Sequence, residues 1–162
     1  MKNVILGMVI ALLFLGCTND KGAVVKSQTA VGNSLETLRL KDQFDKPQSL
    51  NAQTKKVIFA FSKDMGHMSN EFFDKQKPDF LTEHNALFIA DVSSAPSLIR
   101  SMFIMPGLKD FKHTVLVIED KNVAASYRID EKSDQLMVLD LDDFIIKNIR
   151  FVDSEEALGK LF

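Results

Sequence analysis

The sequence predicts one α/β domain in which helices flank a mixed central β-sheet. Two short apolar runs, residues 57–61 and 86–90, have the length and composition of strands buried on both faces. Each run is followed by a segment with helical periodicity, and the last third of the chain alternates strand-like runs with polar turns. A length of 162 residues suits a single domain with an ordinary core.

The elements nearest the first buried strand are an alternating segment and a helix. Residues 38–44 alternate weakly between apolar and polar side chains, and residues 45–47 then turn the chain. Residues 67–77 predict a helix that ends before Pro78. Its apolar residues recur at spacings of four and five, and they are Met68, Phe72 and Phe73.

A second helix is expected after the buried strand at residues 86–90. Ser94 is suited to cap its N-terminus, and Pro106 followed by Gly107 is expected to end it. Between these signals, four large apolar residues form one helical stripe: Leu98, Ile99, Met102 and Phe103.

The last third of the chain predicts two hairpins and a closing helix. The first hairpin pairs residues 114–118 with 123–129, and the second pairs residues 136–141 with 144–151. Ser154 then caps a short helix whose first turn is acidic. Strand and helix alternate first, and hairpins follow, which is the order expected for a mixed sheet.

The N-terminus predicts a secretory signal that ends at Cys17. Residues 4–15 form an almost unbroken apolar run after the positive Lys2, too short to span a bilayer as a helix. The run ends in Leu15-Gly16-Cys17, which resembles the lipobox of bacterial lipoproteins, although Phe14 stands where that family prefers Leu. This resemblance implies cleavage before Cys17 and acylation of that residue, which would give a stable membrane anchor.

The chain therefore divides into three expected parts: a signal peptide over residues 1–16, a lipidated N-terminus and flexible tether over 17–34, and the folded domain over 35–162. Thr18 follows Cys17 in place of the Asp that resembles an inner-membrane retention signal. In a Gram-negative host, the expected location is the periplasmic face of the outer membrane.

Composition excludes two classes of function. The formal net charge of −2 and the absence of Trp provide neither a broad basic field nor a base-stacking platform, so no nucleic-acid partner is expected. Cys17 is the only cysteine, so the folded domain can contain neither an internal disulfide nor a dithiol redox centre.

The order of these segments resembles the peroxiredoxin-like branch of the thioredoxin fold over roughly residues 35–162. Residues 40–50 are similar to its N-terminal hairpin, and residues 59–64 to the strand and loop that lead to its active site. The apolar strand at 114–118 and the following segment through Tyr127 also resemble that branch, with Asn122 in place of the turn glycine. The resemblance implies a thioredoxin-like sandwich and is uninformative about substrate.

Two features of the redox relatives are missing. The stretch that corresponds to their Cys-x-x-Cys motif is Met65-Gly66-His67-Met68, and a thioether can neither ionise nor form a disulfide. The family also carries a cis-proline before a later strand, and neither residues 111–113 nor residues 132–135 contain a proline. These departures argue against thiol oxidoreductase or peroxidase activity.

One local cluster has residues suited to a metal. Met65, His67 and Met68 combine soft thioethers with an imidazole, which suits Cu(I), and Met102 and Met105 are conceivable additional ligands. The alternative is that Met68 fills the core while His67 faces solvent.

Other candidate metal ligands have simpler interpretations. His84 and His113 are interpreted as histidines at strand edges whose ring nitrogens have hydrogen-bond partners. The acidic residues near Asp142 are interpreted as a solvated turn rather than a calcium site.

The leading hypothesis is a lipid-anchored, periplasm-facing protein that binds or assists another envelope protein and has no catalytic residues. The first alternative is a Cu(I)-binding protein, which makes copper the only cofactor considered. The second is an enzyme with a non-thiol mechanism, although no phosphate-binding, dinucleotide-binding or nucleophile motif is present.

Overall fold

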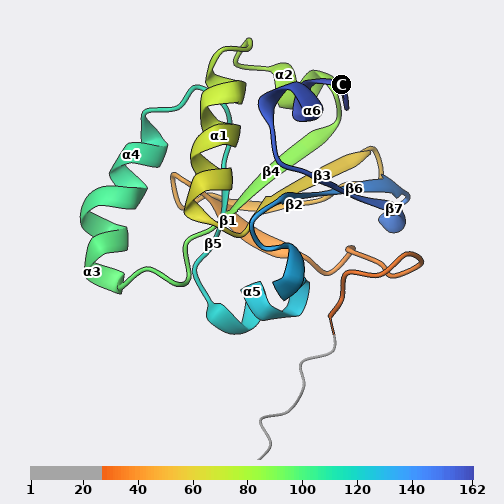
Figure 1. Cartoon of the computed structure of the whole chain (residues 1–162), viewed down its shortest axis with the longest axis horizontal. Coiled ribbons are helices and arrows are strands. Elements are labelled where there is room, and N and C mark those ends of the chain that lie inside the picture. Colours follow the sequence, from red (N-terminus) through yellow and green to blue (C-terminus); the bar gives the residue numbers. More distant parts are fainter. Residues whose placement is uncertain (1–26) are drawn as a thin grey trace, which may run out of the picture.

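The computed structural model describes residues 27–162, and its centre is a seven-stranded mixed sheet with the strand order β2-β1-β5-β4-β3-β6-β7 (Figure 1). β3, β4 and β5 are parallel, and the outer strands pair antiparallel. The strands are β1 (Arg39–Asp42), β2 (Pro47–Ser49), β3 (Lys56–Ala60), β4 (Ala86–Asp91), β5 (Leu116–Ile118), β6 (Leu136–Asp142) and β7 (Ile145–Val152). The expected signal peptide and Cys17 lie outside the described residues.

Helices cover both faces of the sheet. The helical segments are α1 (Lys63–Asp74), α2 (Phe80–Glu83), α3 (Ser97–Ile99), the π-helical turn η1 (Arg100–Ile104), α4 (Met105–Lys109), α5 (Lys121–Tyr127), the 3₁₀ turn η2 (Asp130–Lys132) and α6 (Glu155–Gly159). Within residues 27–162, no helix combines the length and the apolar composition needed to cross a bilayer.

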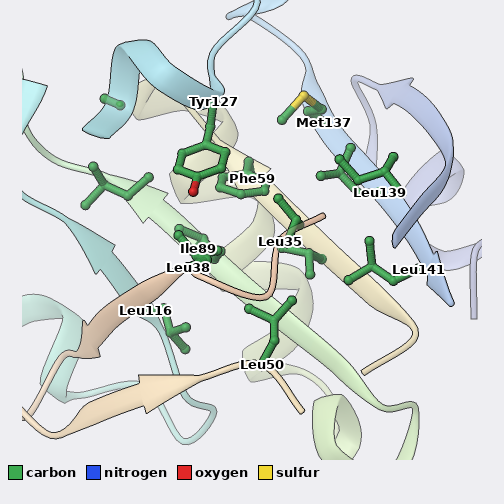
Figure 2. Close-up of a cluster of buried hydrophobic side chains, with 14 residues drawn as sticks. Leu35, Leu38, Leu50, Phe59, Ile89, Leu116, Tyr127, Met137, Leu139 and Leu141 are labelled. Atoms are coloured by element: carbon green, nitrogen blue, oxygen red, sulfur yellow. The ribbon is translucent and has the colours of Figure 1, made fainter. Parts of the chain in front are cut away.

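Two cores form because alternate side chains of the central strands point to opposite faces. Val57 and Phe59 of β3 belong to one core with α5 and the loop around Leu35, and Figure 2 shows this cluster around Phe59 and Tyr127. Phe59 stacks on Tyr127 with ring centroids 5.7 Å apart. Ile58 and Ala60 belong to the other core, which α1, α2, α4 and α6 cover.

The buried strands and the closing hairpin are confirmed. β3 and β4 cover the two apolar runs, and β6 and β7 form the second predicted hairpin. Asp143 and Phe144 both have positive φ in its tight turn, as a hairpin that preserves strand twist requires. Ser154 caps α6, because its hydroxyl accepts from the Ala157 N–H.

The prediction of a first hairpin is wrong, since residues 121–127 form α5 instead of a strand. The Asp120 carboxylate accepts from the Asn122 N–H and caps this helix. Ala124 and Tyr127 then bury one helical face against β5 and β3. The β-branched and aromatic residues of the segment suggested a strand, but the cap and the burial favour the helix.

The second helix also differs from its predicted limits. It begins at Ser97 after Pro96 rather than at a Ser94 cap, and Pro106 and Gly107 lie inside α4 instead of ending the helix. Proline is tolerated there because it occupies the first turn of α4, directly after the π-helical turn. The apolar stripe faces outward, and other residues of this helix, Ile104, Met105 and Leu108, contact the core.

Two smaller boundaries differ as well. α1 starts at Lys63, four residues before its predicted start, because Ser62 caps it. Residues 28–34, expected as part of the tether, make contacts with the domain: the Gln28 N–H donates to the Ser126 carbonyl, and the buried Thr29 hydroxyl donates to the Tyr127 carbonyl.

Candidate functional site

The carboxyl ends of the parallel strands carry the residues considered for function. In open α/β sheets, ligands bind outside this edge. Here β3 leads into Ser62 and α1, β4 ends at Asp91 before α3, and β5 leads through Glu119 into α5. The starts of α1, α3 and α5 therefore lie at the same edge of the sheet (Figure 1).

The first turns of α1 hold the Met-Gly-His-Met stretch. The Ser62 hydroxyl accepts from the Met65 N–H at 3.3 Å and fixes the start of the helix. Met65 and Met68 are half-buried and pack against the core beneath α1, whereas His67 is exposed. The two thioethers thus share a helical face, and the imidazole lies on a different one.

The other methionines considered as ligands diverge. Met105 packs against the same core as Met65 and Met68, but Met102 is 58% exposed. Among residues 27–162, no three His, Cys, Asp or Glu side chains gather closely enough to hold a metal ion. The Cu(I) site therefore stays a prediction that depends on thioethers.

His113 is joined to α1 by a buried hydrogen bond that the sequence did not predict. Asn70 donates through its amide nitrogen to the Gly66 carbonyl at 2.8 Å, so the amide oxygen faces His113 Nε2 at 3.0 Å. Nε2 therefore carries the ring proton, and the buried Nδ1 has no partner in the described part of the chain.

The surroundings of His113 favour its neutral form. Phe73, Phe88 and Phe111 pack around the ring, and the side chain is 2% exposed. Burial lowers the pKa of His113 to about 4, although the nearby Asp74 carboxylate acts in the opposite direction. A neutral, buried imidazole held to α1 is suited to structural support rather than to ligand binding.

A buried carboxylate also lies at the end of β4. The Asp91 side chain is 1% exposed, accepts from the Ser93 N–H at 2.8 Å and lies 3.9 Å from the Arg128 guanidinium. Arg128 also contacts Asp130 at 2.6 Å. These contacts tie the loop after β4 to the end of α5, and the wide separation of the partners along the chain concealed them in the sequence.

The acidic residues of the closing hairpin form ion pairs. Asp140 contacts Lys56 at 2.8 Å and Arg150 at 2.7 Å, and Asp142 contacts Lys55 at 3.0 Å. Burial alone would raise the pKa of Asp140, but its two cationic partners outweigh burial and lower that pKa. Asp142 is exposed beside the turn, which fits the interpretation as a solvated turn, whereas Asp140 lies within β6, is partly buried and is ion-paired instead.

The apolar stripe of α3 and η1 is exposed. The exposed fractions are 65% for Leu98, 44% for Ile99, 58% for Met102 and 65% for Phe103. Beside it lies a shallow cleft of about 530 Å³ between this helix and the β1–β2 turn, with Leu98, Arg100 and Met105 on one side and Asp45 on the other.

Comparison with solved structures identifies the fold. The chain is similar to the peroxidoxin BcpB from Mycobacterium tuberculosis, with a TM-score of 0.51 and 15% identity over 81% of this chain and 92% of that one. A putative protein disulfide isomerase from Bacteroides thetaiotaomicron matches with a TM-score of 0.50 and 14% identity, over 85% and 88% of the two chains. A peroxiredoxin-like protein from Aquifex aeolicus matches with a TM-score of 0.50 and 9% identity over the same shares.

The chain has a thioredoxin-like fold. The likeness to these three structures confirms the predicted fold class, an α/β thioredoxin-like sandwich with a mixed sheet. No family model and no curated protein matches the sequence. Identities of 15% or less carry the fold alone, so the activities named for these neighbours are not transferred.

Proposed function

We propose that this chain is a lipid-anchored, periplasm-facing accessory protein of the cell envelope that acts by binding and lacks thiol redox activity. The observation that carries the proposal is the Met65-Gly66-His67-Met68 stretch at the start of α1, where redox members of the fold carry their cysteines. Met65 and Met68 pack against the core, so these residues serve the fold in place of a thiol pair.

The sequence supports the anchor independently of the fold. Cys17 is the only cysteine and follows an apolar run of signal-peptide length. Acylation of Cys17 would leave no free thiol in the mature chain, which agrees with a role that needs none.

Two measurements test the proposal. Metabolic acyl labelling should mark the wild type and be lost in Cys17→Ser, with Ser27→Ala as a matched control that keeps the label. Crosslinking in intact cells followed by purification of the labelled chain should then recover a defined envelope protein. Normal acyl labelling of Cys17→Ser, or no crosslinked species at all, would contradict the proposal.

Cu(I) binding is the second candidate. It is favoured by the two half-buried thioethers of Met65 and Met68, which share one helical face, and by Met105, which packs against the same core from α4. An anaerobic Cu(I) titration against a competing chelator should give one equivalent, lost in the double variant His67→Ala with Met65→Ala. Equal affinity in that variant and the wild type would eliminate this site.

A further inference from the structure

The helix formed by α3, η1 and α4 is apolar on two sides. Ile104, Met105 and Leu108 pack against the core, and Leu98, Ile99, Met102 and Phe103 project away from it. A helix on the outside of a domain normally presents polar residues to solvent, whereas this one, at the outside of the domain (Figure 1), presents the four apolar residues of the stripe. Exposed apolar residues gathered on one helical face can form an interaction site.

A π-helical turn lies in the middle of this helix. Arg100–Ile104 form a π-helix between α3 and α4. Such turns are rare in proteins, and those that occur often lie at functional sites. Met102 and Phe103 belong to this turn, and both are more than half exposed. The stripe therefore extends from α3 into the π-helical turn.

The helix that carries the stripe has no carboxylate, and the acidic residues Asp45 and Glu119 line the cleft beside Leu98. No Asp or Glu occurs between Asp91 and Asp110, so the stripe can enter an apolar layer without desolvating a carboxylate of its own helix. The cations of this stretch are Arg100 and Lys109. Arg100 donates to the Ala95 carbonyl at 3.2 Å, which pairs its guanidinium within the preceding loop.

The expected anchor also brings the stripe close to a bilayer. Cys17 precedes Ser27 by ten residues, which span at most roughly 35 Å when fully extended. Residues 28 and 29 are fixed to the end of α5, and Arg128, which follows α5, lies 3.9 Å from Asp91 at the end of β4, the strand that precedes α3. A short tether raises the effective concentration of a nearby lipid surface, so even a weak apolar contact becomes populated.

We propose that the stripe Leu98, Ile99, Met102 and Phe103 inserts into the interfacial layer of the bilayer to which Cys17 anchors the chain. This inference rests on the proposed function, because it requires the acylated Cys17. The lipid anchor holds the domain near the membrane, and the stripe turns the carboxyl edge of the sheet toward the lipid. Two such contacts together give more stable attachment than either alone.

The test uses the acylated full chain reconstituted into vesicles of phosphatidylethanolamine and phosphatidylglycerol. A nitroxide is attached to Phe103→Cys, and a control label is attached to Gln53→Cys, which is exposed before β3 at the opposite edge of the sheet. The label at 103 should collide more with oxygen and less with a water-soluble nickel chelate than the label at 53. The same shift should appear at Met102→Cys and shrink when Leu98→Ser and Ile99→Ser are added.

Three results would overturn the inference. Equal nickel accessibility at 103 and 53 would mean that the stripe faces water, and protection found only in native membranes would mean that a protein covers it. Spin–spin broadening that disappears on dilution with unlabelled chain would mean that a second copy covers it. Label stoichiometry separates these results from failure of the proposed function: one label per chain means that Cys17 is acylated, and two labels mean that the anchor itself is absent.

Discussion

Acid should destabilise this domain over a pH range that His113 determines. The imidazole is buried among phenylalanines and is neutral, and its pKa falls from an ordinary 6.5 to about 4 in the folded chain. Between these pH values the unfolded chain binds a proton that the folded chain does not. The contribution to stability is therefore complete above pH 6.5 and is lost as the pH falls toward 4.

The size of the effect follows from the shift. Each pH unit in this range should change the free energy of unfolding by up to about 1.4 kcal/mol, and the full range by on the order of 3 kcal/mol. Carboxylates with lowered pKa, such as Asp42 and Asp140, add their own acid sensitivity as the pH falls below about 5. The range from about 5 to 6.5 thus isolates the histidine.

Urea unfolding at a series of pH values measures this dependence. His113→Gln removes the titration and retains a side-chain amide toward Asn70, so its stability should be nearly independent of pH from 6.5 to about 5. His84→Gln is the matched control, since His84 is half-buried and bonded to the Phe80 carbonyl, and it should keep the wild-type slope. A flat wild-type profile, or an unchanged slope in His113→Gln, would refute the account of this site.

Three further predictions concern packing, ion pairs and activity. Phe59→Ala should cost about 3–5 kcal/mol in urea unfolding, because the ring is fully buried, whereas the exposed Phe103→Ser should change stability by under about 0.5 kcal/mol; equal losses would contradict the described burial. Asp140→Asn should lower the free energy of unfolding by roughly 1–3 kcal/mol at pH 7, because it leaves the partly buried Lys56 without its partner. High salt should reduce this loss, and an unchanged free energy of unfolding would show that the pair contributes nothing. The purified chain should neither consume hydroperoxide nor reduce insulin disulfides, and turnover in either assay would contradict the lack of thiol chemistry.

Local sequence patterns were sufficient to predict the two buried central strands and the closing hairpin. The apolar runs of β3 and β4 and the turn at Asp143 carry their signals within a few residues, and all three were predictable. α5 was missed because the composition of its residues favours a strand. The Asp120 cap favours a helix, but the helix is stabilised mainly when Tyr127 packs into the core, and the local sequence does not show that burial.

Interactions between distant segments were not predictable from these patterns. The Asn70–His113 hydrogen bond joins residues 43 positions apart, and nothing near either residue in the sequence indicates the other. The stripe beginning at Leu98 shows the same limit, because periodicity identifies an apolar face without showing whether the fold covers it. The predicted metal residues Met65, His67 and Met68 all lie on α1, although the predicted helix began at His67, and they are divided between two helical faces.

The intact mass of the chain purified from membranes tests the central claim most directly. The account predicts a chain that begins at Cys17 and carries the mass of covalent acyl groups on that residue. A chain that retains Met1, or one that begins elsewhere with an unmodified Cys17, would contradict the lipid-anchored function and the membrane contact inferred from it.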